Sequence, residues 1–336
     1  MKRRWIAGVR WKLWVGLVIS VVALALAVFG IDLSRVAETL AQAEYAFLIP
    51  AAVGTLGYMF FRAVRWRLLL GTEVSLARCF WVTSIGYLAS NVLPFRLGDP
   101  ARAVVVGREG QVSTAAALST VVVERVLDML MVVGLLAAVL PFVSGAGSAI
   151  GAGLVAGGAA LAASAVLLLL AFRPDWWRLV ARRTLAWVPR LDIERWMQTL
   201  DGLLEGLAPL RSGRRGLALV AWSVVAWACV VGFYWATMRA FMPRPPALAA
   251  PFLVCVVGLG MAVPASPGAV GVFHAVARYG LTVPFDVPAD QAVTVAFAIH
   301  TFQYVFTCLL GLVGLAQESL SLSWVQAQVA KPEKMG

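Results

Sequence analysis

Long apolar runs make up most of the chain, and short segments rich in basic residues separate several of them. A helix that crosses a bilayer needs about 20 consecutive, mostly apolar residues. Six runs are close to that length, so the pattern predicts six membrane-spanning helices: 13–30, 46–61, 114–140, 148–172, 216–241 and 291–316.

Two shorter apolar runs, about 79–93 and 249–263, each end in a break rich in proline and glycine. The breaks lie at Pro94 to Pro100 and at Pro264 to Gly268, and a second short helical piece follows each of them. Pieces this short do not cross a bilayer on their own. We therefore expect two re-entrant hairpins, at about 79–108 and 249–281, within an all-α polytopic fold.

The distribution of basic residues predicts the orientation in the membrane. Cytoplasmic loops carry an excess of lysine and arginine. The N-terminal cluster, the group Arg62, Arg65 and Arg67, and the amphipathic interfacial segment 173–215 all fall on one side, which we assign to the cytoplasm together with both termini. The first hairpin then enters from the cytoplasm and the second from outside.

This topology divides the chain into two halves of opposite orientation, 1–143 and 144–320, followed by a cytoplasmic tail, 321–336. Inverted repeats around a midplane site are typical of transporters. The first run also has the basic flank of a signal peptide, but about 18 residues suffice to span, so we expect it to be retained.

Composition excludes a soluble globular domain, because 61% of the 336 residues are hydrophobic and only 13% are charged. The net charge of +11 lies in discrete segments between apolar runs, so it reports topology and does not predict a nucleic-acid partner. We expect an integral protein of a bacterial inner membrane. The four cysteines lie in apolar stretches without metal-site spacing, and we expect no metal and no cofactor.

Both breaks contain the residues of a helix start. Asp99 and Pro100 have the chemistry of an N-cap followed by proline, and Ser266 and Pro267 repeat it. Free N–H groups at such a start attract an anion. Arg96 and Arg102 bracket the first start, a combination that fits a phosphate group; the alternative is that both arginines extend to the membrane surface.

Glu124, Arg125 and Asp128 lie near the middle of the third apolar run. Each charge costs about 2.5–3.5 kcal/mol there if it is unpaired, which favours a functional role. Arg125 and Asp128 are three residues apart and can pair along one helix. Glu124 then needs another partner, and we expect Arg96 or Arg102.

The equivalent run of the second half carries His300 and Gln303. These two residues either face a substrate path or join helices through hydrogen bonds. His274 lies in the helical piece after the second break, where it is either a headgroup contact or a hydrogen-bonded interior residue.

Three ordered motifs carry a family resemblance: Asn91-x-x-Pro94-x-Arg96-x-Gly98-Asp99-x-x-Arg102, Glu124-Arg125-x-x-Asp128, and Pro264-x-Ser266-Pro267-Gly268-x-x-Gly271-x-Phe273. Over about residues 10–320 the chain resembles the lysylphosphatidylglycerol synthase transmembrane family, the flippase-like module of the multiple peptide resistance factor. The resemblance implies re-entrant hairpins and movement of a lipid between leaflets. The chain departs from the family pattern in two ways. We expect no synthase domain, and therefore no lysyl transfer, and His274 stands where the family pattern leads us to expect glutamate.

We therefore expect a lipid flippase that binds an anionic headgroup in a polar midplane groove, and not an enzyme. A transporter of small soluble anions and an intramembrane lipid-modifying enzyme remain alternatives, although no HExxH or GxSxG motif is present. Small residues at 151–158 are suited to close helix packing, either within the chain or between copies in a homo-oligomer. The expected substrate-binding residues are Arg96, Gly98, Asp99, Arg102, Glu124, Arg125, Asp128, Ser266, Gly268, His274, His300 and Gln303.

Overall fold

The computed structural model describes residues 17–71, 73–93, 97–143, 147–185, 187, 193–261 and 266–329, and these ranges contain helices and no strand. The all-α class is therefore confirmed. After a first helix at 17–28, the α-helices are α2 (Leu33–Ala41), α3 (Leu48–Leu70), α4 (Leu76–Val92), α5 (Gly98–Gly107), α6 (Thr114–Val139), α7 (Gly147–Phe172), α8 (Pro174–Leu185), α9 (Ile193–Gly206), α10 (Gly213–Phe241), α11 (Ala249–Gly260), α12 (Val272–Phe285), α13 (Ala289–Gln317) and α14 (Leu322–Val329).

Within the described ranges, four helical segments are long and apolar enough to cross a membrane: Tyr45–Leu70, Thr114–Phe142, Gly213–Phe241 and Ala289–Gln317. The helices Leu17–Val28 and Leu33–Ala41 are bent by 79° and would form a fifth span as one broken unit. Helix α7 coincides with the expected run at 148–172 and contains no charged residue. The arrangement of six spans with two re-entrant hairpins stays a prediction.

Helix α3 corrects the end of the second expected span, because arginines that we expected after the span lie within the helix. The helix continues to Leu70, and Arg62 and Arg65 lie inside the protein, 3% and 0% exposed. Their side chains are paired with carboxylates of α6. Counting basic residues predicts loops well only when the charges face water, and a sequence does not show which arginines have a buried partner.

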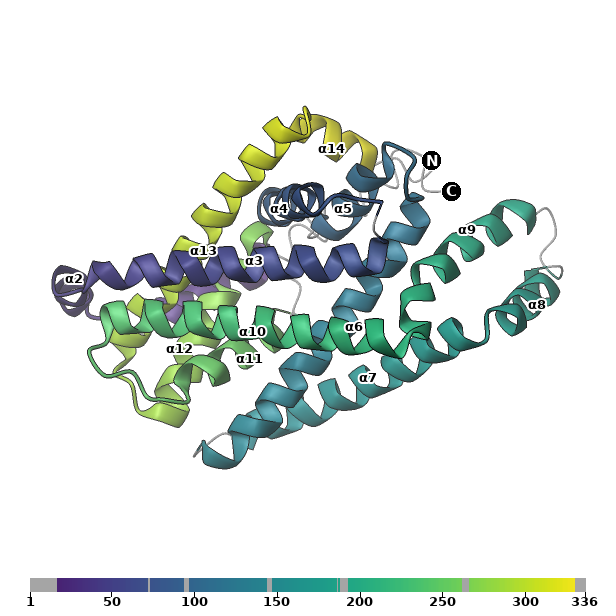
Figure 1. Cartoon of the computed structure of the whole chain (residues 1–336). Coiled ribbons are helices and arrows are strands. Elements are labelled where there is room, and N and C mark those ends of the chain that lie inside the picture. The colour runs from purple at the N-terminus through teal and green to yellow at the C-terminus, as the bar shows by residue number, and fades with distance from the viewer. Residues whose placement is uncertain are drawn as a thin grey trace.

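Helices α3 and α10 form an antiparallel pair along the molecule (Figure 1). The backbone N–H of Glu44, before α3, donates to the carbonyl of Ala240 near the end of α10 over 2.8 Å. A Cβ atom on Gly54 would lie 3.0 Å from the Cys229 carbonyl oxygen, so glycine lets the two backbones approach closely. The second hairpin, α11 and α12, packs beside the α10 half of this pair.

Helices α4 and α5 form the first hairpin and cross at two glycines. A Cβ atom on Gly98 would lie 2.1 Å from the Gly86 carbonyl oxygen, which excludes any larger residue without displacement of a helix. Helix α5 begins at Gly98, with Leu97 at the N-cap position. The expected cap at Asp99 is therefore wrong: Asp99 lies in the first turn, because its carboxylate binds Arg125 of α6.

The second hairpin also begins its second helix later than expected. Ser266 precedes only a short 3₁₀ turn, Pro267–Ala269, and its side chain makes no capping hydrogen bond. Helix α12 begins at Val272, after Gly271, whose φ of +92° is accessible to glycine. The expected start at Ser266 and Pro267 is wrong, because Gly268 and Gly271 both adopt positive φ and interrupt the helix.

Candidate functional site

A buried cluster of charges joins α3, α5 and α6. Glu124 of α6 is 0% exposed and accepts contacts from Arg65 at 3.2 Å and from Arg102 at 2.7 Å. Asp128, one turn further along, binds Arg65 at 2.8 Å and Arg62 at 3.4 Å. The expectation that Arg102 pairs with Glu124 is confirmed, while Arg65 is a partner that the sequence did not indicate.

Arg125 extends the cluster toward the first hairpin. It donates two hydrogen bonds to Asp99, from Nε over 2.7 Å and from Nη2 over 2.6 Å. Its distance to Asp128 is 3.9 Å, so the expected intrahelical pair is the weaker of its two contacts. Arg125 pairs chiefly with Asp99 because the first turn of α5 lies beside α6 and offers both carboxylate oxygens to the planar guanidinium.

Aromatic side chains hold two of the buried arginines. Nη1 of Arg62 donates to the hydroxyls of Tyr58 and Tyr87 over 2.8 and 3.0 Å. The guanidinium carbon of Arg102 lies 4.0 Å from the ring centroid of Trp66, a cation–π distance. These contacts fix the arginines in an apolar interior, where an unrestrained charge is unfavourable.

The described cluster is not electrically balanced. Its bases are Arg62, Arg65, Arg102 and Arg125, and its acids are Asp99, Glu124 and Asp128. Four cations against three anions leave a formal charge of +1 among these residues. A low-dielectric interior makes an uncompensated positive charge attractive to an anion.

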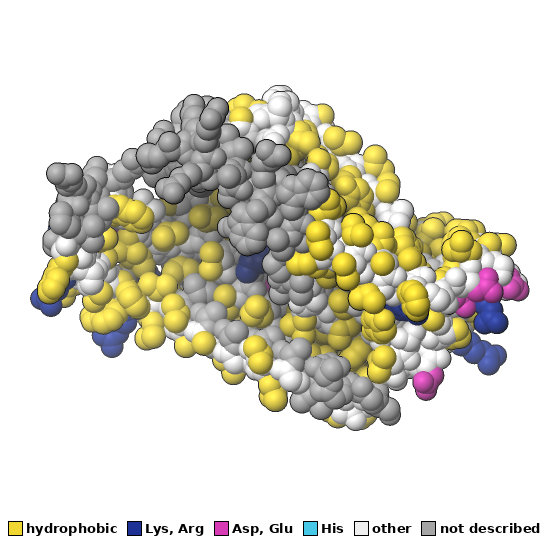
Figure 2. Space-filling view, turned by 180° about the vertical axis from the view of Figure 1, so that it is seen from behind, with side chains coloured by type: hydrophobic (Ala, Val, Ile, Leu, Met, Phe, Trp, Pro, Cys, Tyr) yellow, Lys and Arg dark blue, Asp and Glu magenta, His cyan; other side chains and the backbone are white. Residues whose placement is uncertain are grey.

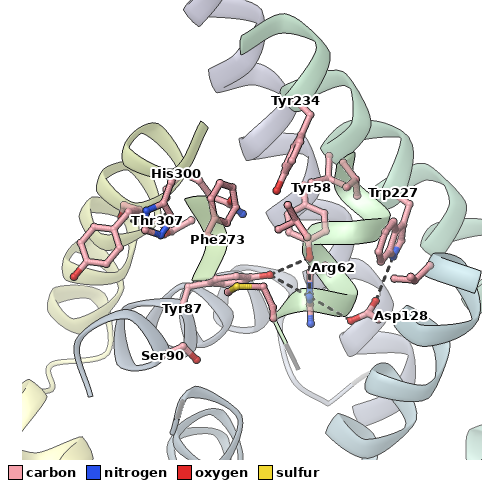
Figure 3. A pocket seen from close by; sticks show the side chains of 18 of the residues that line it. Tyr58, Arg62, Tyr87, Ser90, Asp128, Trp227, Tyr234, Phe273, His300 and Thr307 are labelled. Atoms are coloured by element: carbon pink, nitrogen blue, oxygen red, sulfur yellow. Dashed lines mark hydrogen bonds and ion pairs between the residues drawn. The ribbon is translucent and has the colours of Figure 1, made fainter. Parts of the chain in front are cut away.

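A cavity of about 480 Å³ lies against this cluster and extends to α13. Figure 3 shows Arg62, Asp128 and Trp227 on one side, His300 and Thr307 on the other, and Tyr87 and Phe273 between them. The cavity has an arginine wall and an apolar wall, the latter formed largely by Val132, Val230, Val254, Val257 and Leu259.

The α13 side of the cavity is polar without being charged. His300 Nε2 lies 2.8 Å from the Gly268 carbonyl, and its ring stacks on Phe273 at a centroid distance of 4.7 Å. The Asn91 side-chain amide donates to the Thr307 hydroxyl over 3.0 Å. His300 therefore connects the second break to the cavity, and Asn91 connects the end of α4 to α13.

The structure brings five of the expected residues to the cavity wall: Arg125, Asp128, Gly268, His300 and Gln303. Asp99, Arg102 and Glu124 support that wall from behind through ion pairs. Gly98 lies at the hairpin crossing. Arg96 lies outside the described residues.

Ser266 and His274 have other contacts. The Ser266 N–H donates to the Ser20 hydroxyl over 2.9 Å. His274 is 2% exposed, accepts from the Gly271 N–H at Nδ1 over 3.2 Å and stacks on Phe297. Neither residue lines the cavity, and the His274 geometry is that of an interior residue which caps α12.

Sequence reasoning missed the contribution of α3. Tyr58, Arg62 and Arg65 follow one another at intervals of four and three residues, which places them on one helical face. An aromatic hydroxyl and two arginines on one face of an apolar helix would have indicated a buried site. Tyr87 and Trp227 reach the cavity from α4 and α10 and have no comparable signal in the sequence.

The cavity reaches the surface of the molecule beside α6. Arg125 has a side chain that is 52% exposed, and Met129, one turn away, is 39% exposed. Figure 2 shows the face seen from behind, where hydrophobic side chains cover much of the described surface and a basic side chain lies in a hollow near the middle. The cavity mouth at Arg125 therefore lies beside an exposed apolar side chain of α6.

Outside the expected membrane region, α8 and α9 are joined by Arg178, which donates to Asp201 over 2.7 Å and to Asp175 over 2.9 Å. These hydrogen bonds raise the pKa of the Arg178 guanidinium above its usual value. Among the described residues, no group of three or more histidine, cysteine, aspartate or glutamate side chains has the geometry to hold a metal ion.

Comparison with known proteins identifies the family. The model of the lysylphosphatidylglycerol synthase TM region matches residues 13–311, most of the chain. The chain belongs to this family. All three motifs noted in the sequence lie within the matched residues, and membership of the lysylphosphatidylglycerol synthase transmembrane family indicates a membrane protein of lipid-related transport or synthesis.

A similar curated protein is glycosyltransferase AglD of Haloferax volcanii, which is 32% identical over 128 residues. The similarity covers 37% of this chain and 20% of AglD. No solved structure matches the chain.

Proposed function

We propose that this family member moves an anionic phospholipid between the two leaflets of the membrane, with the headgroup passing through the cavity. The observation that carries the proposal is the pair Arg62 and Arg125 on the cavity wall, backed by a charge cluster with one more cation than anions. A phosphate that leaves water loses its hydration, and fixed guanidinium groups replace part of it. No covalent bond is made or broken in this step.

Arg125 is the residue best placed to receive the phosphate. The side chain of its partner Asp99 is 29% exposed, and the Arg125 side chain is 52% exposed at the mouth of the cavity. Arg65 and Arg102, in contrast, are 0% and 3% exposed and are ion-paired with carboxylates of α6. We infer that Arg125 exchanges Asp99 for the phosphate, while the deeper arginines hold the positive potential.

The surface around the mouth favours a lipid over a soluble anion. The exposed neighbours of Arg125 on α6 include Val122 and Met129, 47% and 39% exposed. Acyl chains that remain in the bilayer would contact this apolar face while the headgroup enters beside it. A solute arriving from water would require a polar vestibule at this point.

The packing of the helices supports two equivalent halves, as alternating access requires. Helix α3 packs on α10; α4 packs on α13, and α11 packs on α6. Suppose that α3, α4, α5 and α6 of the first half correspond in order to α10, α11, α12 and α13 of the second. The contact of α4 with α13 then corresponds to the contact of α11 with α6, and the contact of α3 with α10 corresponds to itself. We propose on this basis an inverted repeat whose halves are 1–143 and 144–320, with the cavity between them.

The test is translocation of fluorescent phospholipids in proteoliposomes, with and without an imposed proton gradient. Dithionite reduces only the outer-leaflet label, so translocation increases the fraction that it quenches. Arg125→Gln removes the charge at the cavity mouth. Arg178→Gln is a matched control, because Arg178 is 41% exposed and also binds two carboxylates, but lies on α8.

We expect wild type and Arg178→Gln to translocate an anionic phospholipid at equal rates. Arg125→Gln should be at least tenfold slower, because it loses a charge-assisted hydrogen bond of about 1.5–3 kcal/mol. Equal rates for all three proteins would contradict the role of Arg125. Uptake of a soluble phosphate ester without lipid movement would contradict lipid transport.

A further inference from the structure

Several uncharged polar groups of the cavity wall, contributed by α4, α10 and α13, have unused hydrogen-bonding capacity. The side chains of Ser90 and Gln303 and the hydroxyl of Tyr234 line the cavity, and none of them makes a hydrogen bond to another described residue. Figure 3 shows the Tyr234 hydroxyl directed toward the cavity. A polar group in the membrane interior is unfavourable without a partner, so these groups indicate a bound polar molecule.

Two further groups add to this set. Asn91 uses its amide nitrogen for Thr307, which leaves its side-chain oxygen available as an acceptor. His300 uses Nε2 for the Gly268 carbonyl, and Nδ1 is then an acceptor if the ring is neutral. The wall therefore offers amide, hydroxyl and imidazole groups in both donor and acceptor roles.

The cavity as a whole is poorly suited to an ammonium group. Asp128 is the one carboxylate among the described residues that line the cavity, and it already contacts Arg62, Arg65, Arg125 and Trp227. The ring faces of Tyr58 and Tyr87 are occupied by the Arg62 guanidinium, 5.6 and 5.7 Å from their centroids. A second cation would therefore meet occupied acceptors and a positive potential.

We propose that the transported lipid carries a neutral polyhydroxyl group on its phosphate, such as glycerol, inositol or a sugar. The proposal rests on the lipid transport proposed above and assigns the cavity two subsites. Arg62 and Arg125 bind the phosphate, and Ser90, Asn91, Tyr234, His300 and Gln303 bind the hydroxyl groups. A hydroxyl both donates and accepts, so it satisfies amides and phenols that a phosphate or an ammonium group alone leaves unpaired.

The experiment compares four fluorescent lipids in wild-type proteoliposomes: phosphatidylglycerol, phosphatidylinositol, phosphatidic acid and phosphatidylethanolamine. We expect the two polyhydroxyl lipids to move roughly 3- to 10-fold faster than the other two, the factor that one or two neutral hydrogen bonds provide. Equal rates for all four, or a preference for phosphatidylethanolamine, would overturn the proposal.

Variants of the polyhydroxyl subsite make the test specific. Gln303→Leu should lower the ratio of phosphatidylglycerol to phosphatidic acid rates several-fold. Gln291→Leu changes another glutamine of α13, whose side chain donates to the Phe241 carbonyl outside the cavity, and should leave that ratio unaltered. Tyr234→Phe removes a single hydroxyl without a change of shape, so it gives the same test if Gln303→Leu does not reconstitute.

The failures of the two proposals are distinguishable. In one outcome, phosphatidic acid moves and its movement depends on Arg125, but polyhydroxyl lipids have no advantage and Gln303→Leu and Tyr234→Phe have no effect. This outcome would overturn the proposed substrate class and would still support lipid transport. Absence of movement for all lipids would overturn both.

Discussion

Replacing Glu124 with glutamine tests whether the buried charge cluster holds α3, α5 and α6 together. The carboxylate is 0% exposed and contacts Arg65 and Arg102 at 3.2 and 2.7 Å. Without it, Arg65 keeps Asp128 at 2.8 Å, whereas Arg102 keeps only Asp99 at 4.0 Å and the ring of Trp66. Arg102, 3% exposed, would then be a buried cation with almost no compensating anion.

Removing one partner of a buried ion pair costs about 3–5 kcal/mol, because the remaining charge is left in a low-dielectric interior. Arg178, which pairs with Asp175 and Asp201 at the surface, provides the comparison. Arg178→Gln should lower the free energy of unfolding by only about 0–1 kcal/mol. The free energies of unfolding are measured by titrating purified protein in mixed micelles with dodecyl sulfate, following tryptophan fluorescence.

The double variant Glu124→Gln, Arg102→Gln removes the orphaned cation together with its carboxylate. We expect the double variant to lose less free energy of unfolding than the two single variants lose together. The difference should be about 2–3 kcal/mol, which is within the range measured for residues in contact. If Glu124→Gln and Arg178→Gln lower the free energy of unfolding equally, or if the two single effects add, the cluster does not hold these helices together.

Three further predictions follow from local geometry. Gly98→Ala should lower both stability and lipid transport, because its Cβ would lie 2.1 Å from the Gly86 carbonyl oxygen. Gly134→Ala is the control and should be neutral, because its Cβ would have no atom within 4 Å. Equal thermal unfolding temperatures for the two variants would contradict the close crossing of α4 and α5 at these glycines. Trp66→Phe should lower the free energy of unfolding by about 1 kcal/mol, because it loses the 3.0 Å hydrogen bond to Thr120 but keeps a ring under Arg102. Trp66→Leu, which also loses the ring, should lower it by about 1 kcal/mol more in the same unfolding titration. Equal losses for the two variants would show that the cation–π contact does not contribute. Arg78→Gln should increase hydrogen exchange at the end of α13, because Arg78 of α4 pairs with Glu318 there and also with Glu109. Unchanged exchange at that end would show that the link is dispensable.

The sequence predicted the elements that depend on local composition. Apolar length indicated the positions of the long helices, and the two breaks do lie between α4 and α5 and between α11 and α12. The charges of α6 were recognised because an apolar helix has few reasons to carry Glu124, Arg125 and Asp128. Hydropathy and intramembrane charge are properties of a short stretch of chain, so they can be read without knowledge of the neighbouring helices.

The features that sequence reasoning missed depend on contacts between distant segments. Arg62 and Arg65 resemble the basic end of a span, and only the position of α6 beside α3 shows that they are buried partners of carboxylates. Asp99 has the chemistry of an N-cap residue, but its carboxylate accepts a hydrogen bond from Arg125 of the neighbouring helix α6, and this contact fixes its direction. Likewise, Ser266 and Pro267 satisfy a sequence rule for a helix start, whereas the positive φ of Gly271 places the start later.

A structure of the protein in lipid nanodiscs, determined with an anionic phospholipid present, tests the proposed headgroup site most directly. We predict phosphate density in the cavity with oxygens within hydrogen-bond distance, about 2.7–3.2 Å, of Arg125 or Arg62, and acyl chains leaving beside Met129 of α6. A cavity that holds only water or acyl chains, with every phosphate at the membrane surfaces, would contradict transport of the headgroup through this site.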